Sequence, residues 1–197
     1  MKQEQEFALF PLTAHVLPGG KLPLRIFEPR YVRMVRDAAA GGRPFCMCML
    51  DVKAKPQTMM NMYPLATEVA IIDFDQLPDG MLGITVQGLR KRRLSRVWVE
   101  QDGLKVGETS VVPEWPKQGL SLTQHKIVDQ LQRLYQDNES LQDLQLDFHD
   151  NDASWLCQRW LELLPMDPND KQLLIEQPDC TAALAFLEQA IRTTGES

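Results

Sequence analysis

Residue types that could perform chemistry are present, but none stands in a catalytic spacing. The one Gly-Lys pair, in Gly19-Gly20-Lys21, lacks the other residues of a phosphate-binding loop, because His15 and Leu22 occupy the glycine and Ser/Thr positions. The other histidines, His125 and His149, are far apart and show no spacing typical of a zinc site. The sequence therefore predicts no enzyme activity, no cofactor and no metal site.

The cysteines fit the same interpretation. Cys46 and Cys48 are two residues apart in an apolar run, so on a strand they share one face and cannot form a disulfide without distortion. Cys157 and Cys180 stand singly and supply no second pair for a zinc site. We therefore expect buried, reduced thiols. With the polar, acidic start Met1–Glu6 and no apolar run of about 18 residues, this favours a cytoplasmic protein without a membrane span.

Charge is divided unevenly along the chain. Up to Gly119 there are 16 Lys/Arg against 13 Asp/Glu, and beyond it 5 against 14. The first part contains one basic cluster near Trp98, made of Arg90, Lys91, Arg92, Arg93 and Arg96. On a strand these charges divide between two faces. Two interpretations stay open: a solvated strand edge that resists aggregation, or a site for RNA or another acidic partner.

A methionine-rich segment offers a binding hypothesis. Met59, Met60, Met62 and Tyr63 crowd residues 51–64, which we expect to form a loop because they show no clear periodicity. Methionine side chains are flexible and polarisable, so an exposed cluster can adapt to many apolar partners. Together with Phe27 and Tyr31, the cluster could form a surface that captures polypeptides. In the alternative interpretation, the loop folds back and fills the core of the sheet.

The pattern of elements predicts strands first and helices afterwards. We expect strands over residues 7–17, 22–27, 45–50, 69–74, 81–86, 88–99 and 104–112, with one helix over 29–40. Two prolines, Pro113 and Pro116, end the strand region. Beyond them, helices start at a capping box at Ser121, at Asp150 or Asp152, at Asp167 and at Asp179. These patterns predict two domains, 1–118 and 119–197.

Two ordered sequence blocks resemble the N-terminal substrate-binding domain of the bacterial Lon protease family. The first block is Phe10-Pro11-Leu12, Leu17-Pro18-Gly19 and Leu22-Pro23-Leu24-Arg25-Ile26-Phe27-Glu28-Pro29-Arg30-Tyr31. The second is Glu68-Val69-Ala70-Ile71-Ile72, Leu77-Pro78-Asp79-Gly80 and Gly83-Ile84-Thr85-Val86-Gln87-Gly88-Leu89-Arg90. The resemblance is strong over roughly the first two thirds of the chain. Within it we expect structural roles for Arg25, Glu28 and Pro29.

The resemblance implies an α+β fold: a PUA-like, β-rich barrel or curled sheet with one inserted helix, followed by a small C-terminal helical bundle. It also implies a stand-alone, non-catalytic module, since no ATPase or protease domain follows before Ser197. Its partners would be unfolded or client polypeptides, with a protease or chaperone as a further partner. RNA binding through the basic strand is the alternative, by analogy with other PUA-like folds.

Overall fold

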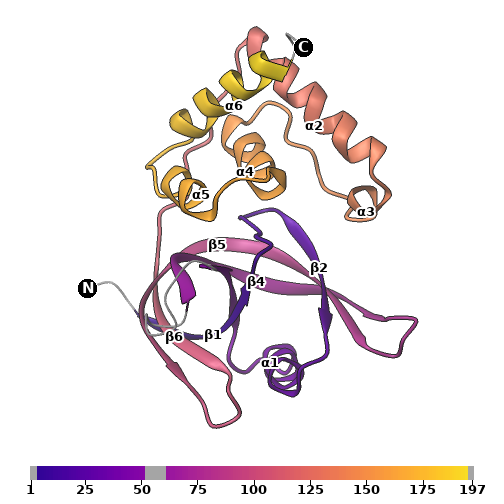
Figure 1. Ribbon diagram of the computed structural model, residues 1–197, viewed down its shortest axis with the longest axis vertical. Coiled ribbons are helices and arrows are strands. Elements are labelled where there is room, and N and C mark those ends of the chain that lie inside the picture. The colour runs from indigo at the N-terminus through magenta and orange to yellow at the C-terminus, as the bar shows by residue number, and fades with distance from the viewer. Residues whose placement is uncertain (1–3, 52–60, 195–197) are drawn as a thin grey trace. The chain divides into compact units, whose positions relative to one another are not determined.

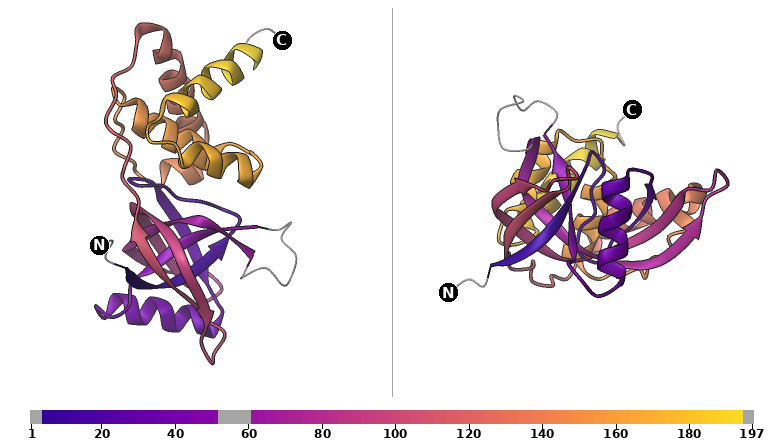
Figure 2. Two further views of the ribbon diagram at one scale, coloured as in Figure 1. Left: turned by 90° about the vertical axis from the view of Figure 1, so that its left-hand side faces the viewer. Right: turned by 90° about the horizontal axis from the view of Figure 1, so that it is seen from below.

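The chain folds into two compact units, Met1–Pro113 and Glu114–Ser197, called here the β unit and the helical unit. The computed structural model describes residues 4–51 and 61–194 (Figures 1 and 2). The domain boundary expected from the sequence, between residues 118 and 119, lies slightly C-terminal of this division.

The β unit contains the strands β1 (Gln5–Leu12), β2 (Lys21–Ile26), β3 (Phe45–Leu50), β4 (Met62–Gln76), β5 (Leu82–Val99) and β6 (Lys105–Val111), and the helix α1 (Pro29–Ala39). The strand order is β2-β5-β4-β3-β1-β6, and β6 pairs with β5 as well. The additional pairing closes β5, β4, β3, β1 and β6 into a barrel, with β2 added outside the ring. The expected barrel with one inserted helix is confirmed.

The long strand β5 organises this barrel. One edge of β5 pairs with β4 over most of its length. The other edge pairs first with β2 and then, beyond Gly88, with β6. At Gly88 the segment that leads into β2 crosses the strand: Gly19 donates to the Gly88 carbonyl at 2.8 Å, and Gly88 donates to Gly20 at 2.9 Å.

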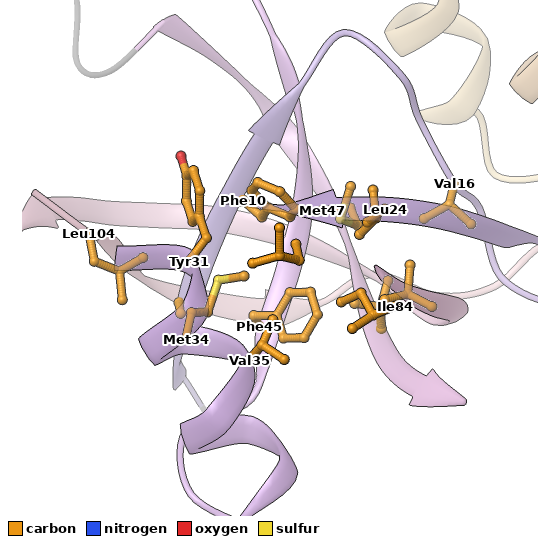
Figure 3. Packing of buried hydrophobic residues seen from close by; sticks show 14 of the residues in the cluster. Phe10, Val16, Leu24, Tyr31, Met34, Val35, Phe45, Met47, Ile84 and Leu104 are labelled. Atoms are coloured by element: carbon orange, nitrogen blue, oxygen red, sulfur yellow. The ribbon is translucent and has the colours of Figure 1, made fainter. Parts of the chain in front are cut away.

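The strand β3 is buried on both faces. Phe45 and Met47 of β3 pack into a large cluster with the α1 residues Tyr31, Met34 and Val35 (Figure 3). Side chains that point to the opposite face form a second cluster, made of Phe7, Leu9, Cys46, Cys48 and Ala66. Since neighbouring residues of a strand point to opposite faces, each continuous apolar run supplies both clusters. This agrees with the expectation that residues 45–50 form a buried strand.

Several strand boundaries differ from the sequence-based prediction, and the strands expected over 81–86 and 88–99 form the single strand β5. The first strand ends at Leu12 rather than at residue 17. Residues 62–64, which we expected in a loop, begin β4, because Met62 pairs with Leu50 across a bulge. The irregular register there accommodates the exposed Pro64, which cannot donate to a strand ladder.

Local signals at the helix ends are largely confirmed. Pro29 occupies the first turn of α1. In the helical unit, Ser121 and Gln124 form a capping box at the short 3₁₀ helix η2 (Leu122–Gln124). Between the two aspartates left open by the sequence, Asp152 caps α4 by accepting a 3.0 Å hydrogen bond from the Ser154 N–H.

The helices of this unit are α2 (His125–Asp137), α3 (Glu139–Gln142), α4 (Ala153–Leu163), α5 (Pro168–Ile175) and α6 (Thr181–Thr194). The helix α4 is buried on nearly all sides, as expected at the centre of a small bundle. Its fully buried Arg159 is neutralised by Glu162, with Nε 2.7 Å from Oε2. Within the described ranges, no helix combines the length and apolarity needed to cross a bilayer.

Candidate functional site

The basic cluster of the sequence lies on β5, but much of its charge is withdrawn from the surface. Lys91 and Arg92 are buried. Glu68 on the neighbouring strand lies 2.8 Å from Arg92 Nε and 3.2 Å from Arg90 Nε. Arg93 is half-buried. The strand therefore presents less positive charge than its sequence indicates.

The cluster is exposed at both ends, at Arg90 and more fully at Arg96. The Arg96 guanidinium lies 5.5 Å from the centre of the Trp98 ring and 3.9 Å from the carboxylate of Glu108. A single cation that stacks on an aromatic ring next to a carboxylate is a common surface arrangement and supplies little field for a polyanion.

The methionine-rich segment is only partly described. Met59 and Met60 lie outside the described residues. Met62 is half-buried and packs against the second cluster. Tyr63, also half-buried, follows it in β4.

Phe27 and Tyr31, the other members of the hypothetical capture surface, have different environments. Tyr31 is buried in the large cluster, its ring 4.4 Å from that of Phe10, and burial raises the pKa of its hydroxyl. Phe27 is 65% exposed. Tyr31 and Met62 thus belong to clusters on opposite faces of the sheet, and Phe27 is the member that offers a large apolar surface to solvent.

Two further exposed apolar side chains belong to the strands beside β2. Phe74 of β4 pairs with Ile84 and is 53% exposed, and Met81, which directly precedes β5, is 38% exposed. The last residue pair between β2 and β5 is Ile26 with Leu82. Phe27 and Met81 are the next residues beyond that pair, one at the end of each strand. We call Phe27, Phe74 and Met81 the hairpin-end apolar group. The β4–β5 hairpin, which carries Phe74 and Met81, projects beyond the other strands (Figures 1 and 2).

A cavity of about 300 Å³ is lined by residues of β2, of β5 and of the end of β4 with the turn after it. Its apolar lining comes from Pro23, Leu24, Leu77 and Ile84, and Arg25 lies among its polar residues. Arg25 forms an ion pair with Asp79 in the turn that joins β4 to β5, so it links that turn to β2. Glu28 precedes α1 and lies 2.6 Å from Arg30 Nη2. The contacts at this end of the β unit are therefore an ion pair for Arg25 and another for Glu28. Pro29 occupies the first turn of α1.

Sequence reasoning included Phe27 but missed Phe74 and Met81. Local alternation predicts the opposite for Phe74, because Asp73 and Asp75 point to the other face of the strand and would leave Phe74 facing the core. That β4 extends past the end of β3, and so leaves Phe74 uncovered on one side, follows from strand pairing and not from the local sequence.

Nucleophile and metal chemistry find little support in the described residues. All four cysteines are free and buried. Burial raises the pKa of the Cys48 thiol to about 12 and shifts that of Cys46 in the same direction, so both stay protonated and unreactive. Within residues 4–51 and 61–194, no three His, Cys, Asp or Glu side chains are grouped so that they could hold a metal ion.

Comparison with known proteins agrees with this architecture. The family model of the ATP-dependent protease La (LON) substrate-binding domain matches residues 6–192. A Lon protease of Dictyoglomus thermophilum is 30% identical over 87 residues, which cover 44% of this chain and 11% of that protease.

Solved structures extend the likeness to nearly the whole chain. The crystal structure of a Lon N-terminal domain protein from Xanthomonas campestris has a TM-score of 0.71 at 29% identity and covers 94% of this chain and 98% of that one. The N-terminal domain of the Mycobacterium avium complex Lon protease has a TM-score of 0.58 at 14% identity, covers 93% and 96%, and shows the same fold. The chain therefore belongs to the family of ATP-dependent protease La (LON) substrate-binding domains.

Proposed function

We propose that this chain is a cytoplasmic, non-catalytic module that binds unfolded polypeptides, and that the hairpin-end apolar group contacts them. The observation that carries the proposal is the exposure of Phe27, Phe74 and Met81 at one end of three paired strands. Exposed apolar side chains of this size at the ends of neighbouring strands are candidates for an interaction site. Family membership supports a polypeptide as the partner, and buried, free thiols suit a reducing compartment.

The chemistry of the group fits a partner of variable sequence. Apolar capture needs no fixed hydrogen-bond pattern, and Met81 can adapt its shape to different side chains. The adjacent cavity of about 300 Å³ is large enough for one apolar side chain. Binding of this kind depends on buried apolar area, so we expect its affinity to change little with salt.

The test is a binding titration with a reduced, carboxymethylated model protein that stays unfolded. The triple variant F27S/F74S/M81S should bind at least about tenfold more weakly, because burying each such side chain contributes on the order of 1.5–3 kcal/mol. The matched control V99S/V111S/L122S removes three other exposed apolar side chains, which are 53%, 48% and 90% exposed. Equal losses in the two triple variants, or a loss in neither, would refute this location.

Two further measurements complete the test. A variant M59S/M60S, which leaves Met62 in place, asks whether the methionine-rich segment contributes to binding. The preparation is also expected to neither hydrolyse ATP nor cleave casein, since its sequence contains no phosphate-binding loop. ATP hydrolysis that disappears on mutation of one of its own residues would contradict the non-catalytic assignment.

A further inference from the structure

The helical unit contains a second candidate site, a cavity of about 640 Å³ between α2 and residues 141–148. This volume is typical of ligand-binding cavities. All eight of its lining residues are uncharged: two leucines, together with Gln132, Gln136, Gln142, Gln145, Tyr135 and Phe148. The absence of charge from this lining contrasts with the sequence beyond Gly119, which has 14 acidic and 5 basic residues.

The aromatic residues give this cavity a fixed wall. The rings of Tyr135 and Phe148 meet edge to face at 5.4 Å, and Phe148 lies 5.3 Å from the buried Trp155. Burial raises the pKa of Tyr135 to about 12, so its hydroxyl stays neutral at physiological pH. The wall is therefore uncharged and aromatic, which suits contact with an apolar side chain.

The glutamines supply polar groups that match a peptide backbone. Each side-chain amide has one carbonyl acceptor and two N–H donors, so it can pair with both the C=O and the N–H of a peptide group. Gln136 and Gln142 are exposed at the cavity, and Gln142 Nε2 donates to the main-chain carbonyl oxygen of Gln136. Four amides around an aromatic wall suit an uncharged stretch of polypeptide better than a charged small molecule.

Acidic side chains follow the lining residues along the chain. Asp137 directly follows Gln136, Asp143 follows Gln142, and Asp147 lies between Leu146 and Phe148; all three carboxylates are exposed. From Gln132 to Asp152 the sequence holds six Asp/Glu and one basic residue other than histidine, the exposed Arg133. Asp137 lines a second cavity on α2, and Asp143 and Asp147 are sequence neighbours of the lining residues. The segment therefore carries a net negative charge that attracts cations and repels anions.

We propose that this cavity binds polypeptide segments in which an apolar or amide side chain stands next to Lys or Arg. The uncharged lining takes the apolar or amide group, and the carboxylates of Asp137, Asp143 and Asp147 attract the neighbouring cations. Nucleic acid and acidic peptides are disfavoured by the same carboxylates. The proposal rests on polypeptide binding by the chain, but it concerns residues separate from the hairpin-end apolar group, so the two sites can be tested independently.

The experiment uses two fluorescent peptides with identical apolar residues, one with lysines and the other with glutamates in the remaining positions. Their binding to the full chain is followed by fluorescence anisotropy. We expect the lysine peptide to bind at least about tenfold more tightly at low salt, and this preference to shrink at about 0.5 M salt, where charges are screened.

Matched variants locate the binding. Q136R places a cation at the cavity and should weaken lysine-peptide binding about tenfold, whereas Q130R, the same change elsewhere on α2, should leave it within about twofold. The triple variant D137N/D143N/D147N should weaken it similarly. D129N/D170N/E176Q removes the same net charge at exposed positions outside the cavity lining and should have a much smaller effect. Melting temperatures confirm that each variant is folded.

The outcomes separate this inference from the function proposed above. The variant F27S/F74S/M81S should bind the lysine peptide with unchanged affinity, even if it no longer binds the unfolded model protein. Equal binding of the two peptides, equal effects of Q136R and Q130R, or equal effects of the two acidic-residue triples would each overturn the inference. Loss of lysine-peptide binding in the folded F27S/F74S/M81S variant would also overturn it, because binding would then depend on the β unit.

Discussion

Arg33 on α1 lies 2.6 Å from Asp102, measured from Nε to Oδ2, although the two residues are 69 positions apart. The same guanidinium is 2.5 Å from Glu100 through Nη2. Arg43 binds the other oxygen of Glu100 at 2.7 Å. These ion pairs link α1 and the segment after it to the end of β5 and the turn that leads to β6.

This network predicts a specific pH dependence of stability. Hydrogen bonds from Arg33 lower the pKa of both Glu100 and Asp102 below their ordinary values. A carboxyl with a depressed pKa stabilises the fold while it is ionised, and the contribution disappears as pH falls through the folded-state pKa. We therefore expect the melting temperature to fall between about pH 5 and pH 3.

The matched variants R33Q and R36Q test the origin of that dependence. R33Q should lower the melting temperature at neutral pH by about 2–5 °C and flatten its decline in acid. Arg36, on the same helix, is largely exposed and lies 3.7 Å from Asp37, so R36Q should change little. The same acid slope in R33Q and the unmodified chain would show that other groups control it.

The pair of Glu68 and Arg92 should matter much more for stability. The side chains are only 12% and 4% exposed, and Arg92 also lies over the Phe7 ring at 4.5 Å. Glu68→Ala removes the carboxylate from a buried guanidinium, so we expect a loss of about 3–5 kcal/mol in the free energy of unfolding. The control Glu108→Ala, at a partly exposed pair 3.9 Å apart, should cost less than about 1 kcal/mol. Urea unfolding measures both, and similar losses would contradict a special role for the buried pair.

Gly88 is the position where the sequence should tolerate no side chain. A Cβ built there would lie 2.1 Å from the carbonyl oxygen of Leu17, whereas at Gly119 no atom lies within 4 Å of such a Cβ. Gly88→Ala must push apart the two backbones that cross there, so we expect a loss of about 2 kcal/mol or more. Gly119→Ala is the control and should stay within about 0.5 kcal/mol of the unmodified chain. If thermal unfolding gives equal effects, the crossing is less tight than its geometry indicates.

Several features were determined by the sequence alone because they depend on neighbouring residues. Pro29 and the apolar spacing behind it specify where α1 begins and which face is buried. The capping box at Ser121 and the cap at Asp167 mark helix starts through hydrogen bonds within a few residues. The uninterrupted apolar run of residues 45–50 indicates burial on both faces. The fold class was predicted from the two sequence blocks that resemble the Lon family.

Only the tertiary structure decided which side chains are covered. Arg92 is buried because Glu68 and Phe7, from two other strands, meet it across the sheet. Phe74 is exposed because β4 runs beyond the end of β3. The cavity beside Tyr135 exists because residues 141–148 return to α2. In each case exposure is set by segments distant in sequence, and local periodicity carries no information about where those segments end.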